Sequence, residues 1–130
     1  MPITHLKKKG IRYIIVGIIA TISHLSVQLN LLAHFPLWIS NMVGFFLGSL
    51  VSYFGHSLFT FQEITSGTIF ARRWLFLQFT LNVSISAFIP FAFSDYQENL
   101  FFKLMLVLIP AFLNFTVWSA AAEFSRKRKL

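Results

Sequence analysis

The 130-residue sequence contains no cysteine, only 12% charged residues and just four acidic side chains. The absence of cysteine excludes a disulfide scaffold, a thiolate metal site and a cysteine nucleophile. Soluble domains carry about 25% charged residues. A chain with half that share and 56% hydrophobic residues has too few polar groups to cover a small soluble domain. The composition therefore indicates a membrane protein.

Four apolar stretches that are nearly free of charge make up most of the chain: residues 11–33, 37–60, 74–93 and 100–122. Each has about 20 residues or more, which is enough for an α-helix to cross ~30 Å of hydrocarbon. The stretches do not alternate in polarity as transmembrane strands do. The sequence predicts an all-α integral membrane protein. Its single domain, residues 1–130, has four transmembrane helices arranged as two helical hairpins.

All but one of the eleven Lys and Arg residues lie in three clusters, at residues 7–12, 72–73 and 126–129. The positive-inside bias therefore places both termini and the central connection in the cytoplasm. A cleaved signal peptide is the competing interpretation of residues 1–20, but the apolar run continues too far and no small-residue cleavage site follows. Anionic lipid headgroups account for basic clusters at membrane edges, so we expect contact with membrane lipid and no nucleic-acid partner.

Uncharged polar and small residues recur at helical spacing inside the predicted helices. One stripe in the second helix predicts close packing against another helix: Gly44, Gly48, Ser52 and Gly55. The amides of Asn41, Asn82 and Asn114 predict hydrogen bonds between helices. Trp38, Trp74 and Trp118 lie near the predicted interfaces, where an amphipathic ring anchors a helix.

Two histidines, His24 and His56, are the ionisable candidates for function, because intramembrane histidines are rare. A neutral imidazole bonded to a hydroxyl is the structural alternative. The predicted helices hold no Asp or Glu except Glu123 at one edge. Neither a catalytic triad, a phosphate-binding glycine loop nor a metal-ligand spacing is present. We therefore expect no enzyme activity, no cofactor and no metal.

Three motifs carry a resemblance to a known family. The pair Arg12-Tyr13 is followed by Gly17 and Thr21, and His24 stands seven positions after the glycine. The second predicted helix ends in the segment VSYFGHSLFTF, residues 51–61, after an entry that contains an asparagine, SNMVGF at 40–45. These motifs resemble those of the GtrA-like family of small four-helix membrane proteins. The chain departs from the family at His56, where Asn is usual, at Ser57-Leu58, where a basic residue is expected, and in a degraded closing motif at 114–124.

The resemblance implies flipping of a polyprenyl-phosphate-linked sugar, such as one on undecaprenyl phosphate, across the inner membrane. The transfer would serve cell-surface polysaccharide or O-antigen modification. Guanidinium groups match phosphate oxygens, and uncharged polar groups lower the cost of moving a sugar through hydrocarbon. The residues expected to bind the phosphate or the sugar are Arg12, His24, Gln28, Asn41, His56, Arg72, Arg73 and Asn82.

Two other functions stay open at this point. The first is a non-transporting accessory subunit that binds and stabilises a membrane glycosyltransferase, which the small-residue stripe fits equally well. The second is a small proton-coupled exporter in which His24 titrates in place of a carboxylate. Because four helices give thin walls for a saccharide path, we expect a homodimer or a hetero-complex.

Overall fold

The computed structural model describes residues 3–92, 95 and 99–128, and within these ranges the chain is helical with no strand. Four helices are long, one is short, and a π-helical segment continues the second long helix. Their bounds are α1 Ile3–Leu31, α2 Leu37–Gly55, the π-helix η1 His56–Thr60, α3 Gln62–Thr65, α4 Arg72–Ala92 and α5 Leu100–Arg128. The prediction of an all-α chain is confirmed.

The first and last helices run further into the basic termini than the apolar stretches predict. α1 begins at Ile3 rather than at residue 11, and α5 ends at Arg128 rather than at residue 122. The predicted spans end where the charged residues begin, because they were defined by apolar composition. Lys and Arg are good helix formers, so the helices continue through them.

Only two segments of the described chain are both long and apolar enough to cross a membrane by composition: Lys7–Leu31 and Ile39–Thr60. α4 carries Gln78, Thr80, Asn82 and Ser86 in its middle, and these polar residues lower its hydropathy. The arrangement of four membrane spans therefore stays a prediction for α4 and α5.

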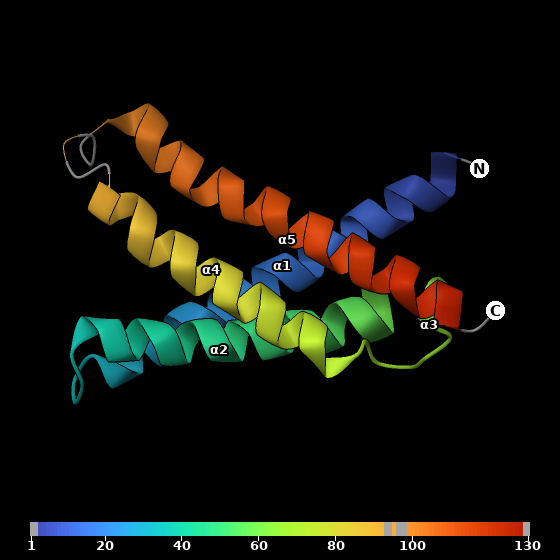
Figure 1. Cartoon of the computed structure of the whole chain (residues 1–130), viewed down its shortest axis with the longest axis horizontal. Helices are drawn as coiled ribbons and strands as arrows, with labels where there is room; N and C mark the ends of the chain where they lie inside the picture. The colour runs from blue at the N-terminus through green and yellow to red at the C-terminus, as the bar shows by residue number, and fades with distance from the viewer. Residues whose placement is uncertain (1–2, 93–94, 96–98, 129–130) are drawn as a thin grey trace.

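The helices form two antiparallel pairs (Figure 1). α1 packs along α2, α4 packs on α2, and α5 packs on α4. The start of α1, the end of α5 and the connection between α3 and α4 lie at one end of the molecule, while the α1–α2 connection, the end of α4 and the start of α5 lie at the other (Figure 1). The three basic clusters are therefore at one end, and we call it the basic end.

Close packing of α1 on α2 depends on glycines. A Cβ atom on Gly44 would lie 2.8 Å from the carbonyl oxygen of His24, and one on Gly48 would lie 3.2 Å from that of Ala20. Gly55 leaves room for Val16 in the same way, with a Cβ-to-Cγ1 distance of 2.6 Å. The three glycines of the small-residue stripe thus face α1 of the same chain.

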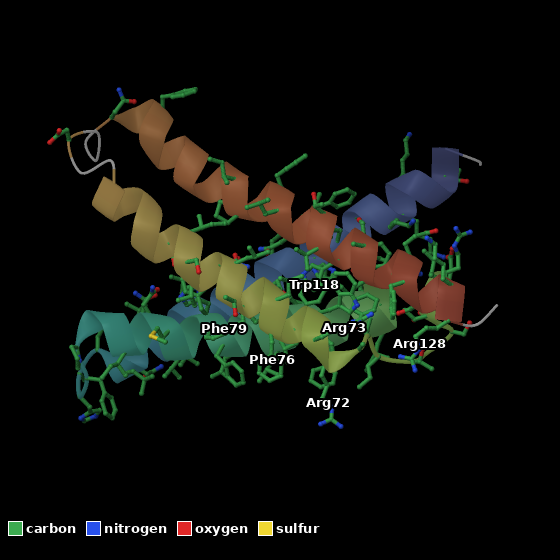
Figure 2. The ribbon with its side chains drawn as sticks, viewed as in Figure 1. Arg72, Arg73, Phe76, Phe79, Trp118 and Arg128 are labelled. Carbon is green, nitrogen blue, oxygen red and sulfur yellow. The ribbon has the colours of Figure 1, made fainter. Side chains whose placement is uncertain are left out.

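An aromatic core lies near the basic end, where α2, α4 and α5 meet. Trp118 is fully buried, and its ring stacks on Phe70 with centroids 5.8 Å apart. Tyr53 and Phe61 complete the aromatic cluster. The prediction that Trp118 anchors an interface is wrong, because the connection before α4 folds back and covers it with Phe70. Figure 2 shows Trp118 among the helices rather than at their outer surface.

Candidate functional site

The π-helical segment places His56 in the interior. His56 is 2% exposed, and its Nδ1 atom lies 2.9 Å from the hydroxyl oxygen of Thr60. Its ring stacks on Tyr13 with centroids 4.7 Å apart, and Trp118 lies 5.7 Å away on another side. π-helical turns are rare and occur often at functional sites. The imidazole is therefore held in place from three sides.

The same segment fixes the connection to α4. Ser57 is fully buried; its hydroxyl donates to the carbonyl of Tyr53 at 2.6 Å and accepts from the backbone N–H of Phe70 at 3.1 Å. The hydroxyl of Thr65 donates to the Ser57 carbonyl at 2.7 Å, and that of Tyr53 donates to the Phe70 carbonyl. Ser57 therefore attaches the connection to the end of α2, a role that a long basic side chain does not fit.

A second polar contact joins α1 to α2 at their other end. The Nε2 atom of His24 lies 3.2 Å from the amide oxygen of Asn41. The half-buried His24 ring also contacts Phe45, with centroids 4.2 Å apart. This pair connects the two helices of the first hairpin, as the sequence predicts for Asn41.

Three side-chain amides form a cluster between α4 and α5, which we call the amide cluster: Gln78, Asn82 and Asn114. The Asn114 oxygen accepts from Gln78 Nε2 at 3.1 Å and from Asn82 Nδ2 at 2.7 Å. The Asn114 nitrogen donates back to the Asn82 oxygen at 3.3 Å. The predicted interhelical hydrogen bonds of Asn82 and Asn114 are confirmed.

A cavity of about 460 Å³ lies beside the amide cluster, and all four long helices line it. Its polar lining residues are Tyr13, Thr21, Ser52, His56, Asn82 and Asn114. A smaller cavity of about 90 Å³ shares Thr21, Ser52, Asn82 and Asn114 with it, and adds His24 and Gln78. None of the lining residues of either cavity is Asp, Glu, Lys or Arg. The arrangement suits an uncharged polar ligand.

Arginines near the basic end have separate surroundings. The Arg12 side chain is 14% exposed, and its guanidinium donates to the carbonyl of Phe59 at 3.4 Å and lies 3.9 Å from the carboxylate of Glu63. With the Gln62 amide turned so that its oxygen faces Arg12, that oxygen accepts from both guanidinium nitrogens, at 2.8 and 2.7 Å. Arg12 is thus engaged within the fold.

The two arginines that begin α4 point in different directions. Arg73 lies over the ring of Phe124 on α5, with its guanidinium carbon 4.1 Å from the ring centroid. Arg72 is exposed and points away from the helices (Figure 2). The structure therefore does not gather Arg12, Arg72 and Arg73 around one point, and of the three Arg72 is the one that projects from the bundle.

Comparison with known protein families gives a match over nearly the whole chain. The transmembrane domain of the GtrA/DPMS family matches residues 12–122, which span all four long helices. The chain belongs to the GtrA/DPMS family. This confirms the resemblance drawn from the motifs and establishes a transmembrane domain. No curated protein and no solved structure matches the chain.

In this GtrA/DPMS domain the predicted ligand residues fall into two groups. His56, Asn82 and His24 line the cavities, whereas Gln28 and Asn41 are not among the lining residues. The prediction omitted Tyr13, Gln78 and Asn114 from the site. The spacing of Gln78 and Asn82, four residues apart on one helix face, was the available signal; the α5 face of the cavity depends on how the second hairpin packs on the first.

Proposed function

We propose that this GtrA/DPMS domain moves the headgroup of a polyprenyl-phosphate-linked sugar across the inner membrane, for cell-surface polysaccharide modification. One observation carries the proposal: a cavity whose lining combines hydroxyl, imidazole and amide groups with apolar side chains, and carries no fixed charge, lies among helices that belong to a membrane family. Such a lining hydrogen-bonds sugar hydroxyls, which would otherwise be costly to bring into hydrocarbon.

The sugar, the tail and the phosphate of the lipid carrier occupy different places in this proposal. The polyprenyl tail stays in the bilayer, next to exposed apolar side chains of α1 such as Ile14 and Ile18. The phosphate is attracted to the basic end, where exposed Arg72 and the basic termini lie. With four spans and both termini in the cytoplasm, this end faces the cytoplasmic leaflet, as the positive-inside bias requires.

The accessory-subunit alternative loses the observation on which it rested. Gly44, Gly48 and Gly55 are covered by α1 within the chain, so this stripe is not free to receive a glycosyltransferase helix. The proton-coupled exporter rests on His24, which is paired with Asn41. Neither alternative explains why the polar lining extends over all four long helices.

A transport assay tests the proposal directly. The purified chain is reconstituted into proteoliposomes that carry a fluorescent polyprenyl-phosphate-linked hexose, and the accessible fraction of the label is followed in time. We expect label to move between leaflets faster than in protein-free vesicles of the same lipid composition. Equal rates with and without the protein would contradict the proposed function.

A further inference from the structure

We propose that the amide cluster binds hydroxyl groups of the sugar headgroup, with Gln78 as the residue that accepts a hydroxyl hydrogen, and that the headgroup arrives sideways from the bilayer between α1 and α5. The proposal rests on the proposed function for the identity of the ligand. It assigns sugar binding to Gln78 and Asn114, which are not among the ligand residues expected from the sequence.

The hydrogen bonds within the cluster leave one acceptor atom without a donor among the described residues. Gln78 is 4% exposed, and its Oε1 atom is buried without a hydrogen-bond partner among the residues that the structure describes. A buried acceptor without a partner costs free energy, so a ligand hydroxyl that donates to this oxygen removes that cost. Gln78 also lines the smaller cavity, so this oxygen belongs to a residue beside open volume.

Unused donors complete the match to a polyol. Each side-chain amide nitrogen has two hydrogens, and Asn114 Nδ2 uses one of them on the Asn82 oxygen. Among the residues that the structure describes, the second hydrogen of this group and that of Gln78 Nε2 have no acceptor, so both are open to ligand oxygens. A site with one open acceptor, open donors and no cation suits neighbouring hydroxyl groups, each of which donates and accepts. It does not suit a phosphate, whose charge the lining leaves unpaired.

The route of entry follows from how the helices pack. α1 packs on α2 and η1 but hardly on α5, and the larger cavity lies between α1 and α5. On α1 its lining includes Ile14, Ile18 and Ile22, which are 54–60% exposed on the outer surface. Its volume of about 460 Å³ falls within the range of about 300–1,000 Å³ typical of small-ligand sites. A headgroup in the larger cavity therefore reaches Asn82 and Asn114, which also line the smaller cavity beside Gln78, while its tail stays in lipid.

Holding α4 against α5 does not by itself account for Gln78. Asn82 and Asn114 already bond to each other in both directions, at 2.7 and 3.3 Å. Gln78 adds only one bond to an oxygen that already has a donor. Replacing Gln78 by an apolar residue of similar size therefore removes the ligand acceptor and leaves the reciprocal pair of asparagines intact.

The test measures binding independently of transport. The full chain is placed in phosphatidylcholine nanodiscs and titrated with farnesyl-phosphate-linked glucose, a short-chain probe, and separately with farnesyl phosphate. We expect the glucose conjugate to bind more tightly than farnesyl phosphate. Gln78→Leu should weaken binding of the conjugate about tenfold, which corresponds to the loss of one hydrogen bond, and leave binding of farnesyl phosphate unchanged.

A matched control is Thr80→Val, which removes a polar group from the exposed side of α4 between Gln78 and Asn82. It should leave the affinity for both probes as in the unmodified chain. Thermal unfolding of each variant tests whether Gln78→Leu is folded. If Gln78→Leu is unfolded, Gln78→Glu and Gln78→Ala are compared instead. Gln78→Glu retains an acceptor at this position and should keep more of the affinity for the conjugate than Gln78→Ala.

Two outcomes overturn the assignment: equal affinity of Gln78→Leu and the unmodified chain for the conjugate, or equal affinity of the unmodified chain for both probes. The second outcome assigns recognition to the phosphate. These results are separable from the proposed function. Binding that depends on Gln78 without faster flipping contradicts transport and keeps the site, whereas flipping with Gln78-independent binding contradicts the site alone.

Discussion

Tyr13 of α1 stacks on His56 of the π-helical segment, and its hydroxyl donates to the backbone carbonyl of Ala111 on α5 at 3.0 Å. One side chain thus links three parts of the chain at one end of the cavity. Because α1 makes few other contacts with α5, this link controls how closely the first helix approaches the last.

Removing the hydroxyl of Tyr13 separates its two contributions. Tyr13→Phe keeps the stack on His56 and loses the bond to Ala111, so we expect the free energy of unfolding to fall by about 1 kcal/mol. Tyr13→Ala also loses the ring and should cost about 3 kcal/mol or more. Unfolding in detergent measures both values, and equal losses in the two variants would show that the stack contributes nothing.

Ser57→Ala should loosen the connection between η1 and α4. The variant leaves the backbone N–H of Phe70 without its acceptor, which costs about 1–3 kcal/mol for a buried group. Hydrogen exchange over residues 62–71 should accelerate, whereas the exposed Ser84→Ala on α4 serves as the control and should change nothing. Unchanged exchange in Ser57→Ala would mean that the connection is held by other contacts.

Gly44→Ala should force α1 and α2 apart. The added methyl group would lie 2.8 Å from the backbone oxygen of His24, which can yield only if the helices move. We expect a lower melting temperature and weaker contact between His24 and Asn41. Gly10→Ala meets nothing within 4 Å and should stabilise α1 by about 0.5–1 kcal/mol. Equal changes in melting temperature for Gly44→Ala and Gly10→Ala would argue against close packing of α1 on α2 at Gly44.

Arg12 and Arg72 should differ in the property that they control. Arg12→Ala removes the contacts to Phe59 and Glu63 and should lower thermal stability. Arg72→Ala, at an exposed side chain, should leave stability unchanged but weaken binding of farnesyl phosphate, with a smaller loss at high salt because exposed charges are screened. A loss of stability in Arg72→Ala, or weaker binding with unchanged stability in Arg12→Ala, would contradict these roles.

Membrane topology can be tested without first removing native thiols, because the chain has no cysteine. A membrane-impermeant maleimide added to intact cells should label His34→Cys, in the exposed connection after α1, and should not label Lys127→Cys near the end of α5. Permeabilised cells should label both. Labelling of Lys127→Cys in intact cells would exclude cytoplasmic termini.

Apolar length was sufficient to predict the four long helices, though not their ends in the basic termini, since these helices depend on local composition. The neighbours of Trp118 were not predictable in this way. Its burial arises because Phe70, from a connection with no helical pattern, packs on its ring. The direction of the Arg73 side chain likewise depends on Phe124 of α5, a contact between distant segments that sequence spacing does not encode.

The cavity was only partly predictable for a similar reason. The four-residue spacing of Gln78 and Asn82 placed both on one face of a helix, but only the packing of the second hairpin brings Asn114 against them. The sequence gives no periodic signal for a π-helix, so its five residues read as the continuation of α2.

Within that π-helical segment, the carbonyls of Ser57 and Phe59 accept hydrogen bonds from Thr65 and Arg12, which belong to other parts of the chain. Both acceptors are oriented by the wider turn. Deleting one residue there would restore ordinary helical winding and rotate both oxygens away from their donors. The length of the segment between Gly55 and Phe61 therefore constrains this protein more tightly than the chemical identity of the apolar residues within it.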